Sequence, residues 1–306
     1  MIVEPKFRGF ICTTSHPTGC KKNVENQIEY VKENGKIEGA KRVLVLGAST
    51  GYGLASAIVA SEACDAEVLG VSFEREAKGK RTASAGWYNI ESLKKFAEGE
   101  GKKFISVNGD AFSNEVKSEV IDLIKENMGK VDLVIYSLAA PKRKDPVSGE
   151  VYSSCLKTVG APFTSKTLDF HTGEIQDITI NPATEEEIEG TRKVMGGEDW
   201  MLWIEALKEA NVLEKGVKTI AYSYIGPEVT YPIYREGTIG RAKNDLEKTA
   251  GEITKVLKSL DGEGYISVNK ALVTQASSAI PIVSLYISIL YKVMNCLLYT
   301  SDAADE

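Results

Sequence analysis

The stretch Arg42-Val-Leu-Val-Leu-Gly-Ala-Ser-Thr-Gly-Tyr-Gly53 decides the fold, because an apolar run leads directly into a turn with three glycines. The run Arg42–Leu46 is typical of a strand buried on both faces of a parallel sheet. A helix of small residues, Leu54–Ala63, follows the turn. Glycines let a ligand approach the backbone, and the free N–H groups of a helix N-terminus attract a pyrophosphate. We predict a nucleotide-binding turn here; a tight turn without a ligand is the alternative.

Further apolar runs extend this unit. We expect strands at Glu67–Phe73, Lys103–Asp110 and Val131–Ser137, with helices at Ile90–Glu98 and Glu115–Met128 between them. This alternation predicts a parallel sheet with right-handed crossovers. The glycine spacing G-x-x-x-G-x-G resembles that of the short-chain dehydrogenase/reductase superfamily. The predicted fold class is therefore α/β, a Rossmann-type doubly wound parallel sheet.

The alternation breaks between residues 141 and 197. The pieces Val147–Val159 and Phe163–Ile180 favour strands joined by turns, and the acidic run Glu185–Glu189 is typical of the first turn of a helix. We interpret this segment as an inserted excursion near the mouth of the site, with a hairpin and a short helix. Regular elements then resume, at Glu198–Ala210, Lys218–Tyr224, Ile239–Leu260, Gly264–Thr274 and Ile280–Met294.

An acid at the end of the second strand bears on the choice of cofactor. Glu74 lies where a dinucleotide fold hydrogen-bonds the adenosine ribose, and its charge repels a 2′-phosphate. This favours NADH over NADPH. The cations that follow point the other way, since they are able to bind a phosphate: Arg75, Lys78, Lys80 and Arg81. After the third strand, Asp110 and Ala111 lie where such folds hold the adenine ring.

Four tyrosines precede a helix that carries a lysine: Tyr222, Tyr224, Tyr231 and Tyr234. A phenol can donate a hydrogen bond to an oxygen that becomes negative, and a nearby ammonium favours the phenolate form. On one unbroken helix, Tyr234 and Lys243 would point about 180° apart. Glycines at 237 and 240 bracket the helix start, so we expect Tyr234 on a loop that folds back toward Lys243. The alternative is a packed strand end beside a solvated lysine.

Composition restricts the possible partners. The chain has 306 residues, 43% hydrophobic and 26% charged, and its net charge of -6 argues against a nucleic-acid partner. Five scattered cysteines without a C-x-x-C pair favour free thiols in a reducing compartment, and no leader is expected before the charged N-terminus, so we expect a cytoplasmic protein. His16 and Cys20 lack two further metal ligands, so we expect a turn before a helix at Val24–Glu33. The segment Ile280–Met294 is too short and interrupted for a membrane span.

Several pieces of the sequence together resemble one family. They are Gly47-Ala-Ser-Thr-Gly-Tyr-Gly53, Ser137-Leu-Ala-Ala-Pro141, Tyr224-Ile-Gly-Pro227, Tyr234-x8-Lys243 and Lys270-Ala-Leu-Val-Thr-Gln-Ala-Ser-Ser278. The chain resembles the trans-2-enoyl-CoA and enoyl-acyl-carrier-protein reductases of the FabV/TER type. The Tyr-x8-Lys spacing is the specific part, since ordinary short-chain dehydrogenases use Tyr-x3-Lys or Tyr-x6-Lys. The resemblance runs from Met1 to about Met294.

This resemblance implies roles for named residues. It implies that Tyr234 is the proton donor, that Lys243 contacts the cofactor, and that Tyr224 contacts the substrate thioester. In the mechanism that we expect, Lys243 also lowers the pKa of the phenol. No metal is expected. The NADH contacts that the resemblance implies, besides Lys243, are Gly47, Ala48, Ser49, Thr50, Gly51, Tyr52, Phe73, Glu74, Asp110, Ala111, Leu138, Ala139, Leu272, Val273 and Thr274.

We therefore expect an NADH-dependent reductase of the 2,3-double bond of enoyl-CoA or enoyl-acyl-carrier-protein thioesters, acting as a monomer without a membrane partner. A short-chain ketone or aldehyde reductase and a non-catalytic NAD-binding module are the alternatives. Residues 1–294 are expected to form a single domain. Family members continue past Met294 with further helices, so we expect a C-terminally truncated chain in which residues 295–306 are a non-native tail.

Overall fold

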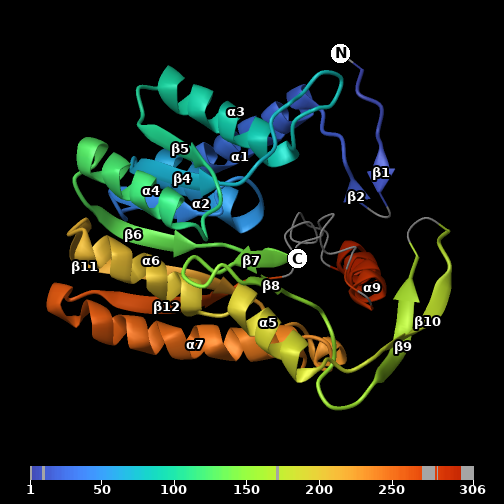
Figure 1. Ribbon diagram of the computed structural model, residues 1–306. Coiled ribbons are helices and arrows are strands. Elements are labelled where there is room, and N and C mark those ends of the chain that lie inside the picture. Colours follow the sequence, from blue (N-terminus) through green and yellow to red (C-terminus); the bar gives the residue numbers. More distant parts are fainter. Residues whose placement is uncertain (1, 9–10, 170–171, 271–279, 281, 298–306) are drawn as a thin grey trace.

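A six-stranded parallel sheet forms the centre of the computed structural model, which describes residues 2–8, 11–169, 172–270, 280 and 282–297 (Figure 1). The strand order is β12-β11-β6-β3-β4-β5, and every neighbouring pair is parallel. The strands are β3 (Arg42–Leu46), β4 (Glu67–Ser72), β5 (Phe104–Asn108), β6 (Val131–Tyr136), β11 (Leu213–Ser223) and β12 (Glu263–Val268). The chain order reverses between β3 and β6, where doubly wound folds bind their ligands. The predicted fold class is confirmed.

The register aligns the carboxyl ends of the central strands. Leu46 of β3 lies opposite Tyr136 of β6, and Tyr136 lies opposite Ala221 of β11. In turn, Tyr222 lies opposite Ser267 of β12. The glycine turn after β3 and the tyrosines at the end of β11 therefore emerge at the same edge of the sheet.

Two apolar cores fill the two faces of the sheet. One core packs α1, α2 and α3 against β3 and β4, and the other packs α4, α6 and α7 against β6 and β11. Both cores are built from buried aliphatic residues, and the second also contains Trp200 and Trp203. These helices and the two 3-10 turns are α1 (Pro17–Glu33), α2 (Gly51–Glu62), α3 (Ala85–Gly99), α4 (Asn114–Asn127), α6 (Glu198–Glu209), η1 (Glu228–Thr230), α7 (Thr238–Val256) and η2 (Leu257–Leu260).

The excursion contains two hairpins, whereas one was expected. They are formed by β7 (Lys142–Lys144) with β8 (Val151–Ser153), and by β9 (Phe163–Leu168) with β10 (Ile175–Ile180). The acidic run begins α5 (Glu185–Met195), where Thr184 and Glu187 form a capping box. The β9–β10 hairpin packs against α9 (Val283–Leu297), through a hydrogen bond of 3.0 Å between Thr167 Oγ1 and Ser284 Oγ (Figure 1). A short hairpin, β1 (Phe7–Arg8) with β2 (Ile11–Cys12), lies near the N-terminus.

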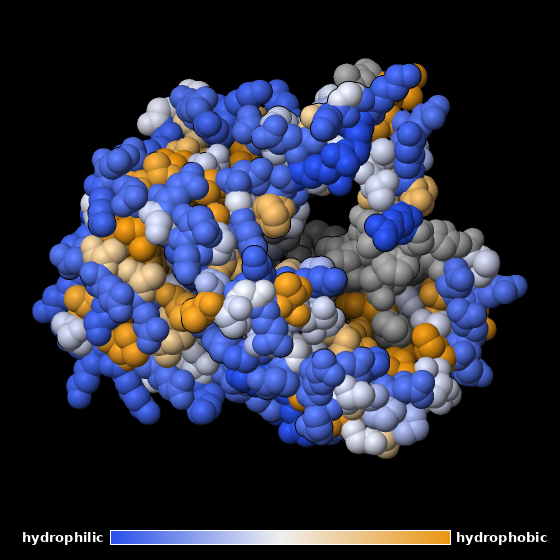
Figure 2. Space-filling model, viewed as in Figure 1, coloured by the Kyte–Doolittle hydropathy of each residue, from blue (hydrophilic) through white to orange (hydrophobic). Residues whose placement is uncertain are grey.

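Several boundaries differ from the sequence-based prediction. Helix α1 begins at Pro17 and not near Val24, because the side chain of His16 accepts a hydrogen bond from Gly19 N and caps the helix. Strand β11 begins five residues early, with an irregular register between Leu213 and Lys218. The predicted strand end at 271–274 lies outside the described residues. None of the described helices is long and apolar enough to cross a membrane, and the face in Figure 2 is mainly hydrophilic.

Candidate active site

The turn after β3 is too tight for any residue but glycine at two positions. Gly47 has a φ of +90°, and a Cβ there would lie 2.2 Å from Ser137 O. A Cβ on Gly53 would lie 1.9 Å from Gly47 O. Helix α2 begins directly in this turn, and its N-cap Thr50 makes no side-chain hydrogen bond to the first turn. The N–H groups of that turn are therefore left for an anionic ligand, which fits the pyrophosphate of a dinucleotide.

The acid predicted to select NADH lies over this turn. Glu74 Oε1 accepts a hydrogen bond of 2.6 Å from Ser49 Oγ. Asn108 at the end of β5 accepts from Glu74 N at 2.7 Å and donates to Glu74 O at 2.9 Å. The side chain of Phe73 is 76% exposed, so it is accessible to a ligand. Glu74 is thus fixed at the edge where an adenosine ribose is expected.

The loop predicted to hold adenine is anchored from beneath. Asp110 Oδ1 accepts from Phe112 N at 3.0 Å. The carbonyl oxygen of Ala111 accepts hydrogen bonds from Lys117 Nζ at 3.2 Å and from Trp203 Nε1 at 3.0 Å. Of the other predicted contacts, Leu138 is half-buried and Ala139 is exposed, beside the end of β6. Leu272, Val273 and Thr274 lie outside the described residues.

A buried ion pair lies under this loop. Lys117 Nζ is 2.8 Å from Asp199 Oδ1, and both side chains are almost fully buried. Tyr136, the last residue of β6, donates to Asp199 Oδ2 at 3.1 Å. Burial raises the pKa of Asp199, because the charged form is desolvated. The pair connects the adenine loop, the centre of the sheet and α6.

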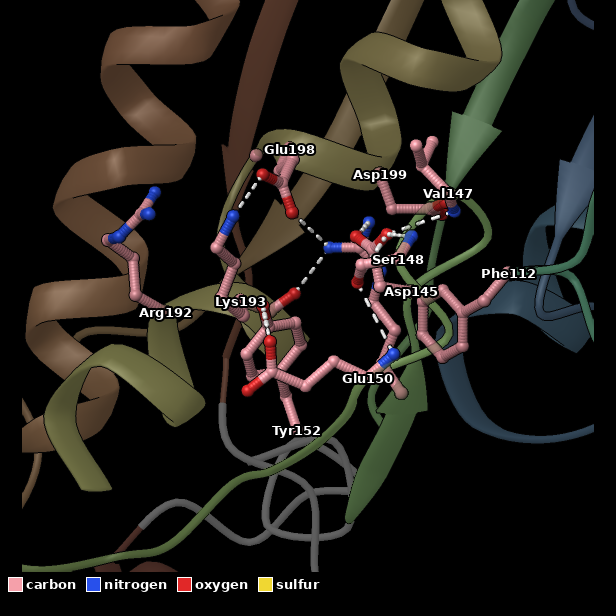
Figure 3. A network of polar contacts seen from close by, with 12 residues as sticks. Phe112, Asp145, Val147, Ser148, Glu150, Tyr152, Arg192, Lys193, Glu198 and Asp199 are labelled. Carbon is pink, nitrogen blue, oxygen red and sulfur yellow. Dashed lines mark hydrogen bonds and ion pairs between the residues drawn. The ribbon is translucent and has the colours of Figure 1, made fainter. Parts of the chain in front are cut away.

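A second network connects the excursion to the same region (Figure 3). Arg143 of β7 is fully buried, and its Nη1 donates to Lys193 O and to Glu198 Oε2, each at 2.6 Å. The guanidinium also lies over the ring of Phe112, 5.9 Å from its centre. Lys193 Nζ pairs with Glu198 Oε1 at 2.5 Å. Arg143 therefore ties β7 to the junction of α5 and α6 and to the adenine loop.

Lys243 points at the end of β11. Its Nζ donates to the main-chain oxygen of Tyr222 at 3.1 Å. The Tyr222 ring lies edge-on to Tyr52 of the glycine turn, with centroids 5.9 Å apart, and its hydroxyl bonds to Ser56 of α2. Burial lowers the pKa of Lys243 from 10.5 to about 8. The ammonium is therefore placed beside the nucleotide turn. Its contact on β11 is Tyr222, the residue directly before the buried Ser223.

Tyr234 lies on a turn that folds back over the start of α7, as the glycine pattern predicts, whereas the contacts among the described residues do not include one between its phenol and Lys243. Its carbonyl oxygen accepts hydrogen bonds from Gly237 N at 3.2 Å and Gly240 N at 2.8 Å. Its ring packs edge-on against that of Tyr224, with centroids 5.1 Å apart and planes at 87°. Tyr224 also lines a cavity of about 190 Å³ with Tyr286 and residues after β12. The two phenols that the sequence singled out are therefore in contact.

The acidity of Tyr234 differs from the expectation. Burial raises the pKa of its phenol well above the ordinary value, and the neighbouring Tyr224 raises it further. The Tyr-x8-Lys spacing predicts instead that Lys243 lowers this pKa. The reason for the difference is tertiary: Ile282, Val283 and Ile287 belong to the apolar cluster that covers Tyr234. The raised pKa favours the neutral phenol over the phenolate in this arrangement.

Two family models match nearly all of the chain. The one described as the NAD(P)H binding domain of trans-2-enoyl-CoA reductase matches residues 2–79, and the one described as the trans-2-enoyl-CoA reductase catalytic region matches residues 81–299. The chain belongs to the trans-2-enoyl-CoA reductase family. The resemblance found in the sequence is therefore confirmed.

Members of this family are similar over most of their length. The chain is 99% identical over 294 residues to a trans-2-enoyl-CoA reductase (NADH) of Clostridium perfringens, which covers 96% of this chain and 76% of that protein. It is 60% identical to an enoyl-acyl-carrier-protein reductase (NADH) of Flavobacterium johnsoniae, covering 96% and 74%. A crystal structure of Clostridium acetobutulicum trans-2-enoyl-CoA reductase in complex with NADH matches with a TM-score of 0.94 at 47% identity, covering 99% and 77%.

The buried groups behind the site of this family member are not predicted from the sequence. One signal was available: Lys117 lies three and seven residues before Val120 and Ile124, on the apolar face of α4. A lysine on a buried stripe indicates a buried partner. That partner, Asp199, resembles an ordinary acid in the first turn of a helix, so its sequence position gave no indication.

Proposed function

We propose that this chain reduces the 2,3-double bond of trans-2-enoyl thioesters, carried by coenzyme A or by an acyl carrier protein, with NADH as cofactor. The observation that carries the proposal is the Tyr224–Tyr234 pair at the carboxyl end of β11, beside the Lys243 that bonds to Tyr222. The printed names of the relatives, trans-2-enoyl-CoA reductase (NADH) and enoyl-acyl-carrier-protein reductase (NADH), support it.

The residues that would hold NADH follow from the edge of the sheet. The uncapped first turn of α2 would bind the pyrophosphate, and Glu74 would accept a hydrogen bond from the adenosine ribose. Lys243 would contact the nicotinamide ribose. The bound cofactor would supply a hydride to the β-carbon of the substrate.

The phenol of Tyr234 would stabilise the thioester oxygen as it becomes enolate-like. A raised pKa keeps this phenol protonated at neutral pH, so it remains able to donate. The ring of Tyr224 holds that of Tyr234 in a fixed orientation, and Tyr224 would also contact the thioester. Such preorganised donors act without rearrangement at the moment of reaction.

A comparison of two substrates distinguishes the proposed reaction from the alternative, which is reduction of a ketone. NADH consumption is followed with crotonyl-CoA and with acetoacetyl-CoA, and the products are identified by mass spectrometry. We expect saturated butyryl-CoA from the first and no turnover with the second. A hydroxyacyl product from acetoacetyl-CoA, without reduction of crotonyl-CoA, would contradict the proposal. Binding of NADH by the folded chain without oxidation in either reaction would favour a non-catalytic module.

We also propose that the protein works in the cytoplasm. All five cysteines belong to the described residues, and each is a free thiol, as expected in a reducing compartment. The test is fractionation of cells that produce the protein, with mass spectrometry of its thiols. The monomeric state stays a prediction, which size-exclusion chromatography with light scattering would test.

A further inference from the structure

Groups from three elements surround Glu74, and one of them, Ser49, bonds directly to its carboxylate. Ser49 of the glycine turn donates to Oε1 at 2.6 Å. Asn108 of β5 bonds to both main-chain groups of Glu74. Asn89 of α3 donates to the main-chain oxygen of Ser49 at 3.0 Å from a buried position, which anchors the backbone of the residue whose hydroxyl bonds to the carboxylate.

The third element, helix α3, approaches Glu74 with a glycine, Gly86. A Cβ on Gly86, the second residue of α3, would lie 2.1 Å from Glu74 Oε1 and 2.7 Å from Ser49 Cβ. The backbone does not require glycine here, because its φ lies outside the left-handed range. Glycine also weakens a helix relative to alanine. Glycine is therefore required at position 86 for lack of space, because the Glu74 carboxylate and its hydrogen bond to Ser49 occupy the place of a side chain.

Cations lie beside this carboxylate in the sequence. Arg75 follows it directly, and the guanidinium of Arg75 is 3.5 Å from Thr13 O, in the segment before α1. Lys78 and Arg81 are exposed, and their main chains pair in an isolated antiparallel β-bridge. A carboxylate held at the ribose position would keep a 2′-phosphate away from these groups.

We propose that Gly86 is a positioning residue for cofactor choice: its missing side chain lets Glu74 hydrogen-bond to Ser49, and this orientation sets the preference for NADH over NADPH. The inference rests on the proposed function, because it concerns the same dinucleotide. It assigns the selectivity to a residue on α3 that is placed to contact the carboxylate and not the cofactor.

The test measures the dissociation constants of NADH and NADPH by the fluorescence of the reduced nicotinamide, without substrate. The variants are Gly86→Ala, Ser49→Ala and the double variant, and circular dichroism checks that each is folded. The matched control is Gly99→Ala on the same helix, where a Cβ would meet nothing within 4 Å. The ratio of the two constants is the readout, because a general loss of stability weakens both ligands alike.

We expect Gly86→Ala to lower the preference for NADH about tenfold, the size of one lost hydrogen bond to a charged group, and Gly99→Ala to leave it unchanged. Ser49→Ala should lower the preference without a clash. The double variant should be no worse than Gly86→Ala, since both changes remove the same hydrogen bond.

An unchanged ratio in Gly86→Ala and Ser49→Ala would overturn the inference, as would additive effects in the double variant. If Gly86→Ala does not fold, Ser49→Ala alone decides by the same ratio. A folded wild-type chain that binds neither dinucleotide would instead overturn the proposed function, and this inference with it.

Discussion

The Nζ atom of Lys243 lies 3.1 Å from the main-chain oxygen of Tyr222, two residues before the tyrosine whose ring contacts Tyr234. The ammonium therefore contacts the end of β11, and the phenol ring contacts the residue that directly follows this strand. Tyr222 also contacts Tyr52 of the glycine turn. A single strand end thus connects the nucleotide turn with both groups of the Tyr-x8-Lys spacing.

The first prediction concerns the buried ammonium. The folded-state pKa of Lys243 is about 8, below the ordinary 10.5. Below pH 8 both folded and unfolded states carry the proton, and burial of the charge destabilises the fold. Between pH 8 and 10.5 only the unfolded state keeps it, so the free energy of unfolding rises with pH. Lys243→Met removes this cost but also removes one hydrogen bond. We expect a net gain of about 2 kcal/mol in the free energy of unfolding at pH 7.

Urea unfolding at a series of pH values measures this difference. The gain of Lys243→Met over the wild type should be largest below pH 8 and shrink toward pH 10.5. A gain that does not depend on pH would show that the charge is not the cause. Reductase activity should be lost in the same variant.

The second prediction tests the glycine turn. Gly47→Ala places a Cβ 2.2 Å from Ser137 O at a φ of +90°. We expect a loss of about 3 kcal/mol in stability together with loss of NADH binding. Gly35→Ala is the control, because its φ of +84° gives the same strain while a Cβ meets nothing within 4 Å. That variant should lose about 1 kcal/mol and bind NADH normally. Equal losses in both variants would contradict the crowding at Ser137.

The third prediction concerns the ion pair beneath the adenine loop. Asp199→Asn leaves the Lys117 ammonium buried without a counter-charge, and we expect a loss of about 3 kcal/mol in urea unfolding. Adding Lys117→Met should recover most of it. Glu252→Gln in the exposed Lys248–Glu252 pair should change stability by less than about 0.5 kcal/mol. A double variant that loses the sum of the two single effects would contradict the pairing.

The sheet could be predicted from the sequence because its signals are local. Continuous apolar runs mark strands that are buried on both faces, and the glycine turn after Leu46 sits between a strand and a helix. The turn that carries Tyr234 was predictable for the same reason, from the neighbouring glycines and the helical periodicity after them.

The buried groups of the site could not be predicted in this way. Lys117 and Asp199 are 82 residues apart in the sequence, and only the packing of α4 against α6 brings them together. The raised pKa of Tyr234 depends on burial under residues near 282–287, which no local pattern reveals. Gly86 looks like a weak point in a helix until the position of Glu74 is known.

The measurement that tests the central claim most directly is the rate of NADH oxidation with crotonyl-CoA in the Tyr234→Phe variant. This change removes one hydroxyl and keeps the ring contact with Tyr224. We expect kcat to fall by about 10²–10³-fold, as for the loss of one donor to a developing oxyanion, while the dissociation constant of NADH stays within about twofold. Tyr30→Phe, at an exposed position on α1, is the control for the same chemical change and should be unaffected. Wild-type turnover in Tyr234→Phe would contradict the account.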